Sequence, residues 1–176
     1  ATAGAAAAFM VNAFSYLGLI FVLSKWKPPE TKRLLPREPI SIAILAGLRY
    51  VSLSPKIQIT LLRATLFAIA ASAVPALMPL VAKELLKGGP LVYGGLLGAF
   101  GIGAVLGAFS SRRLRARLST DGIIRLSSTA LVIGVTCAAF SGTVIFTIPA
   151  LMIAGAGWVL ALSTFNVAIQ LSAPRW

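Results

Sequence analysis

Histidine is absent from this 176-residue sequence, and acidic residues number only four. The single cysteine, Cys137, lies in an apolar run, so the chain has neither a disulfide framework nor a cysteine-based metal site. None of the four acids (Glu30, Glu38, Glu84 and Asp121) falls inside a predicted membrane span. The usual serine–histidine, paired-aspartate and metal chemistries therefore lack their components. The sequence predicts a protein that is not an enzyme and needs no metal or cofactor.

Charge of either sign is also scarce. Charged residues make up 11% of the chain, hydrophobic residues 58%, and the mean hydropathy is +0.92. A water-soluble chain of this length would need a polar surface that these residues do not provide. The net charge of +12 does not indicate nucleic-acid binding, because the basic residues are grouped between apolar segments. The lipid bilayer is the expected environment.

The stretch from Leu91 to Ser119 shows the pattern most clearly. It reads LVYGGLLGAFGIGAVLGAFSSRRLRARLS and carries no charge from Leu91 to Ser110. About 20 helical residues cover the hydrocarbon thickness of about 30 Å. Four arginines then arrive together and mark the cytoplasmic side, because loops rich in Lys and Arg stay inside. This predicted cytoplasmic loop, residues 111–122, contains Arg112, Arg113, Arg115 and Arg117.

Glycines in the same stretch predict close helix packing. At about 100° per residue, Gly94, Gly98 and Gly101 share one face of a helix. Gly103 and Gly107 fall on nearly the opposite face. A helix that is smooth on both faces suits close contact with neighbours on two sides.

Five spans follow from the uncharged runs, so the expected fold is an all-α, polytopic membrane protein. The first span is Ala3–Ser24, and the third is Leu91–Ser110. The second is about Ile59–Ala82 and is uncharged from Ala64 onward. The uncharged run from Leu126 to Pro174 is too long for one span and holds two, with a turn at Ser141–Thr143. Pro75 predicts a kink in the second span, since it removes the donor to the carbonyl of Ala71. This kink is read either as a plain structural bend or as the border of a cavity.

Two polar segments connect these spans. Residues 27–58 form a basic connector punctuated by prolines, and within it Pro39–Leu53 has apolar residues at helical spacing. This part is read either as an amphipathic helix lying on the inner membrane surface or as a plain tether without lipid contact. Lys83–Pro90 is predicted to be a short outer loop. In this topology every basic residue except Lys83 and Lys87 lies on or next to the inner side, which fixes the orientation.

Residues Gly107–Arg117 carry a resemblance to the major facilitator superfamily, and in particular to its bacterial multidrug and siderophore exporters, such as the enterobactin exporters. The loop motif of that superfamily matches at Gly107, Arg112, Arg115 and Arg117. Ser111 stands where the motif has an aspartate and Leu114 where it has a second glycine, which weakens the case for a charge relay through this loop. The glycine-rich span before the arginines and the ending FNVAIQLSAPRW are similar to the same exporters.

The resemblance implies helices six to ten of a twelve-helix transporter in a bacterial inner membrane. Residues 1–26 would be the last helix of the N-terminal half, 27–58 the cytoplasmic connector, and 59–176 the first four helices of the C-terminal half. The first residue is Ala, so the chain is expected to be an internal fragment, with the remaining helices of the same transporter as partners. The fragment alone is expected not to transport, and any proton carrier is expected outside it.

The resemblance further implies export of a small-molecule substrate by alternating access, with the cavity between the two halves. The second and fifth spans would line the cavity. The candidate cavity residues are Ser72, Pro75, Trp158, Thr164 and Asn166. The arginines of the predicted loop are either topology signals alone or partners for phosphates and carboxylates.

Other classes remain open. A non-transporting membrane scaffold or a channel subunit would share the same spans, although no charged ring for a pore appears within them. An intramembrane enzyme is the third class, but it would need catalytic residues from outside this sequence.

Overall fold

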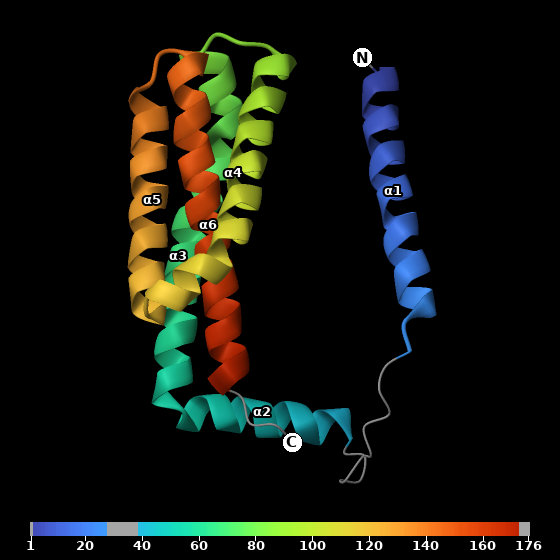
Figure 1. Cartoon of the computed structure of the whole chain (residues 1–176), viewed down its shortest axis with the longest axis vertical. Helices are drawn as coiled ribbons and strands as arrows, with labels where there is room; N and C mark the ends of the chain where they lie inside the picture. The colour runs from blue at the N-terminus through green and yellow to red at the C-terminus, as the bar shows by residue number, and fades with distance from the viewer. Residues whose placement is uncertain (1, 28–38, 173–176) are drawn as a thin grey trace. The chain divides into compact units, whose positions relative to one another are not determined.

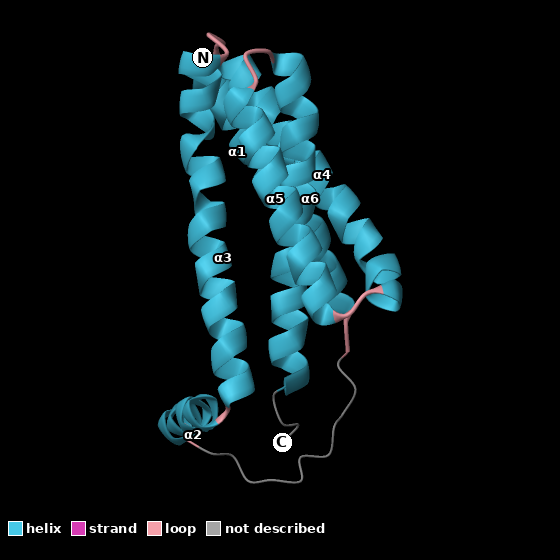
Figure 2. Cartoon of the chain, turned by 90° about the vertical axis from the view of Figure 1, so that its left-hand side faces the viewer, coloured by secondary structure: helices cyan, strands magenta, loops and turns pink. Residues whose placement is uncertain are grey.

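A computed structural model of the chain describes residues 2–27 and 39–172, and every regular element within these ranges is helical (Figure 2). The helices are α1 (Thr2–Lys25), α2 (Ile40–Leu53), α3 (Pro55–Leu80), the π-helical segment η1 (Val81–Leu85), α4 (Pro90–Arg117), α5 (Thr120–Phe140) and α6 (Val144–Ser172). The chain divides into two units, Ala1–Ala43 and Ile44–Trp176. The predicted all-α class is confirmed.

Four of the described helical segments are long and apolar enough to cross a membrane. They are Pro55–Leu85, Pro90–Arg117, Thr120–Phe140 and Val144–Ser172. Together with the fold they confirm a polytopic membrane protein. Helix α1 has 24 residues, and its described apolar part is the shorter Phe9–Lys25, so its role as a fifth span stays a prediction.

In the second unit the long helices alternate in direction, and α6 packs against α3, α4 and α5 (Figure 1). One end of this bundle holds the starts of α3 and α5 and the ends of α4 and α6. The opposite end holds the connections after η1 and between α5 and α6. The turn predicted at Ser141–Thr143 is confirmed, since α5 ends at Phe140 and α6 begins at Val144.

Glycines allow the backbones of α4 and α6 to touch. A Cβ placed on Gly103 would collide with the carbonyl of Met152, and one on Gly107 would lie 2.7 Å from the carbonyl oxygen of Ala156. Gly155 of α6 meets the backbone of Phe100 in the same way. No larger residue fits at these positions unless the helices move apart.

Helix α6 also approaches α5 closely, through a second set of glycines. A Cβ on Gly134 would lie 2.5 Å from the carbonyl oxygen of Ala150, and one on Gly157 would lie 2.6 Å from that of Ser127. Helix α6 is therefore held between α4 and α5 by backbone contact on both sides. This sandwich of α4, α6 and α5 forms the close-packed part of the unit.

No described helix covers the second glycine face of α4, so close packing on that face stays a prediction. Gly94, Gly98 and Gly101 are exposed, and a Cβ on any of them would meet no atom within 4 Å. Of the two glycine faces, only the one with Gly103 and Gly107 lies against another described helix. Angular position along a helix shows which residues share a face, but it does not show whether a neighbour covers that face.

The predicted loop at residues 111–122 is wrong as secondary structure. Helix α4 continues through all four arginines to Arg117, and only Leu118 and Ser119 separate it from α5. Arginine and alanine are good helix formers, so the helix outlasts the apolar run. Ser119 then caps α5 by accepting a hydrogen bond from the backbone N–H of Gly122 at 3.2 Å.

Helix α3 differs from its prediction at both ends. It begins at Pro55, a favourable first position for proline, and remains helical through Pro75 and Pro79. The π-helical segment then includes Lys83 and Glu84, which had been placed in the outer loop. The helix predicted at Pro39–Leu53 is confirmed as α2, whereas the proline-rich residues 28–38 lie outside the described ranges. The kink at Pro75 stays a prediction.

Candidate functional site

A groove runs between α3 and α5, with α6 as its floor. It consists of three cavities of about 520, 450 and 130 Å³. The first two share Arg63, Asp121, Ile124 and Phe165, and the last two share Ala70, so the cavities follow one another along the helices. We call this feature the α3–α5 groove.

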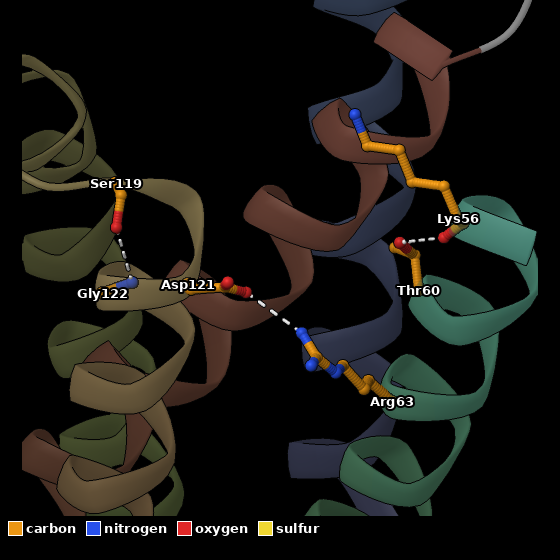
Figure 3. Close-up of polar contacts among 6 residues, drawn as sticks. All are labelled: Lys56, Thr60, Arg63, Ser119, Asp121 and Gly122. Carbon is orange, nitrogen blue, oxygen red and sulfur yellow. Dashed lines mark hydrogen bonds and ion pairs between the residues drawn. The ribbon is translucent and has the colours of Figure 1, made fainter.

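An ion pair crosses the groove near its basic end, which is the end lined by Lys56, Arg63 and Arg125. The Nη1 atom of Arg63 on α3 lies 3.0 Å from the Oδ1 atom of Asp121 on α5 (Figure 3). Asp121 occupies the first turn of α5, where a negative charge also interacts favourably with the helix dipole. Both side chains remain more than half exposed, at 55% and 67%, so the pair contributes little to stability.

The helix bounds correct the prediction that no acidic residue lies within a span. Asp121 and Glu84 both lie on helical segments that are candidate spans, although each is at the end of its segment. The sequence prediction ended each span where its apolar run ends, and so it placed both acids in loops. The helices in fact extend past the apolar runs and include both acids. Arg63 and Asp121 were therefore missed as a pair. Fifty-eight positions separate them in the chain, and only the antiparallel packing of the helices joins them.

Beyond the ion pair, in the direction of Ala70, the lining of the groove is mainly apolar. The rings of Phe67 on α3 and Phe165 on α6 pack with centroids 6.0 Å apart and form part of its floor. Leu131 and Val132 on α5 line the wall opposite Leu66. The smallest cavity continues this apolar surface through Ala73, Leu77 and Val135.

The five predicted cavity residues do not line the groove. Ser72 and Pro75 are exposed on α3, and Ser72 donates a hydrogen bond to the carbonyl of Ile69 at 2.7 Å. Asn166 is exposed on α6 and donates to the carbonyl of Leu162 at 2.9 Å. These three side chains are available to a ligand from outside the described bundle.

Two of the predicted cavity residues, both on α6, have side chains that pack within the bundle. Thr164 is only 2% exposed, and its hydroxyl donates to the carbonyl of Leu160 at 2.6 Å. Trp158 packs its ring against Phe100 of α4 with centroids 5.7 Å apart. In this structure Thr164 is a core residue and Trp158 a helix-packing residue.

The four arginines at the end of α4 differ in their surroundings. Arg115 is half-buried and donates a hydrogen bond from Nη2 to the hydroxyl of Ser163 on α6 at 3.1 Å. Arg112, Arg113 and Arg117 are exposed. The structure thus connects Arg115 to the bundle. The sequence pattern did not distinguish it from the other three arginines.

Four apolar helical segments, of which α6 packs against the other three, define a polytopic α-helical membrane protein. The whole chain, residues 1–176, matches the family of major facilitator transporters described as transmembrane secretion effector, and the chain belongs to that family. This membership supports a role as a transporter or exporter. Neither the curated proteins nor the solved structures contain a significant match.

Proposed function

We propose that the chain forms helices six to ten of a twelve-helix exporter that moves an amphiphilic small molecule across a bacterial inner membrane by alternating access. In this assignment α1 ends the N-terminal half, α2 belongs to the cytoplasmic connector, and α3 to α6 begin the C-terminal half. The family match over residues 1–176 is the observation that carries the proposal.

The packing within the second unit supports a moving-half mechanism. Backbone contacts through glycine join α4, α5 and α6 into one close-packed body, as alternating access by rigid halves requires. Helix α3 adds to this body mainly through side chains, such as the pair of Phe67 and Phe165. The exposed Ser72 and Pro75 of α3 and Asn166 of α6 are the residues that we assign to the substrate cavity.

Cysteine protection during transport tests this assignment. Ser72→Cys is placed in the complete transporter, in a background in which Cys137 is replaced by serine, and the protein is reconstituted into liposomes. We expect a water-soluble thiol reagent to block counterflow of an amphiphilic drug, and we expect an excess of that drug to slow the reaction. The matched control is Ser110→Cys on α4, since Ser110 is also exposed and bonded to its own helix, at 2.8 Å from Leu106 O.

The outcomes separate the candidate functions. Substrate protection at position 72 but not at position 110 supports the carrier and its cavity. A protein that shows no exchange for any member of a drug panel would support the scaffold instead. Downhill flux without counterflow would support a channel subunit.

A further inference from the structure

The basic end of the α3–α5 groove contains none of the residues that we assign to the substrate cavity. Its lining includes three cationic side chains, Lys56, Arg63 and Arg125, and one carboxylate, that of Asp121. Asp121 already pairs with Arg63. The cationic charge of Lys56 and Arg125 therefore remains unneutralised by the described lining residues.

These charges line two adjoining cavities: Lys56 lines the one of about 520 Å³, Arg125 the one of about 450 Å³, and Arg63 lines both. Lys56 and Arg63 are seven residues apart on α3, which puts them on one face about 10 Å apart along the axis. Asp121 and Arg125 are four residues apart on α5 and also share a face. Figure 3 shows Lys56 and Arg63 leaving α3 on the same side, toward α5 and α6. Thr60, Ser119, Thr120 and Ser172 also line the cavity that contains Lys56.

The apolar continuation of the groove shows what kind of anion fits. Directly beyond Arg63 and Arg125 the lining changes to Leu66, Leu131 and Val132. Leu66 is 60% exposed and Val132 is 63% exposed, so the groove opens sideways to the surrounding hydrocarbon. A soluble anion would use only the polar end, whereas a lipid with an anionic headgroup uses both parts.

We propose that the α3–α5 groove binds an anionic phospholipid, with its phosphate between Lys56, Arg63 and Arg125 and its acyl chains along Leu66, Leu131 and Val132. Basic pockets between spanning helices are known to hold anionic headgroups. The ion pair of Arg63 with Asp121 keeps the Arg63 guanidinium in the groove, where its remaining N–H groups can donate to a phosphate oxygen. This inference does not depend on whether the protein transports.

Lipid retention tests the site. The transporter is purified in mixed micelles that contain phosphatidylglycerol and phosphatidylcholine in equal amounts, and the retained lipids are counted by native mass spectrometry. We expect phosphatidylglycerol to be retained in preference to phosphatidylcholine. Lys56→Gln and Arg125→Gln should each lower that preference about fivefold, since each removes one cation near the headgroup.

Arg113→Gln on α4 is the matched control, because it removes the same charge from an exposed position that lines none of the three groove cavities. It should leave the lipid preference unchanged. Equal retention of the two lipids, or an equal loss of preference in all three variants, would overturn the proposal. Displacement of the lipid by inorganic phosphate at millimolar concentration would also overturn it, because the site would then recognise a free anion.

Discussion

Single glycines determine how closely α6 approaches its neighbours. Gly103 lies against the backbone of Met152, so even a methyl group requires the two helices to separate. In a well-packed interior such overpacking costs about 1–3 kcal/mol. We expect Gly103→Ala to lower the free energy of unfolding by that amount, measured by thermal unfolding of the detergent-solubilised chain.

Gly98→Ala is the internal control for this prediction, because the same change is made on the same helix in open space. Alanine is the better helix former, so the variant should be neutral or more stable by about 0.5–1 kcal/mol. Equal destabilisation by the two substitutions would show that the close approach of α4 and α6 does not account for the cost.

Arg115 also contributes to helix packing at the scale of a single residue. Arg115→Ala removes the hydrogen bond to Ser163 and some contact between α4 and α6, and we expect a loss of stability of about 1 kcal/mol. Arg113→Ala removes an equal charge from an exposed position and should change stability by less than about 0.5 kcal/mol. Unfolding of both variants under the same conditions gives the comparison. If Ser163→Ala and Arg115→Ala were fully additive in the double variant, the hydrogen bond would not be the cause.

At the scale of the element, α2 is a helix with exposed apolar residues. None of its residues is buried against the described parts of the chain, and Ile44 is 58% exposed although it is apolar. Tyr50 donates a hydrogen bond to the carbonyl of Ser172 at 2.9 Å, which attaches α2 to the end of α6. A helix held at the end of a bundle with exposed isoleucine and leucine is suited to the membrane surface.

Spin labels distinguish a surface helix from a plain tether. A label at Ile44 should be more accessible to oxygen, which concentrates in the bilayer, and a label at Arg49 to a water-soluble nickel chelate. These positions lie on different faces of α2, about 140° apart. Equal accessibility of the two labels to both reagents would favour the tether.

Most of the helices could be predicted from the sequence because lipid imposes a simple length rule on apolar runs. That rule locates α3 to α6, but it ends them close to the limits of the apolar runs. Arg117, Lys83 and Asp121 show the error, since backbone hydrogen bonding and the Ser119 cap extend the helices past the hydrocarbon. The α3–α5 groove could not be predicted, because it depends on which faces of α3 and α5 are turned toward each other.

At the scale of the whole molecule, charge is distributed between the two ends of the second unit. The helix ends that contain Lys56, Arg113 and Arg125 lie together, and Lys83 and Lys87 lie at the other end (Figure 1). This bias predicts that the arginine-rich end faces the cytoplasm, because cytoplasmic segments retain Lys and Arg. The proposed exporter and the proposed lipid site both require this arrangement.

Thiol labelling in sealed vesicles tests the central claim, that four helical segments cross a bilayer with their basic ends on one side. Single cysteines replace Lys56, Arg113 or Lys87 in the chain without Cys137, and an impermeant reagent is added to inside-out vesicles. We predict that positions 56 and 113 react at once and that position 87 reacts only after the membrane is permeabilised. Immediate reaction at position 87 together with position 113 would contradict the account.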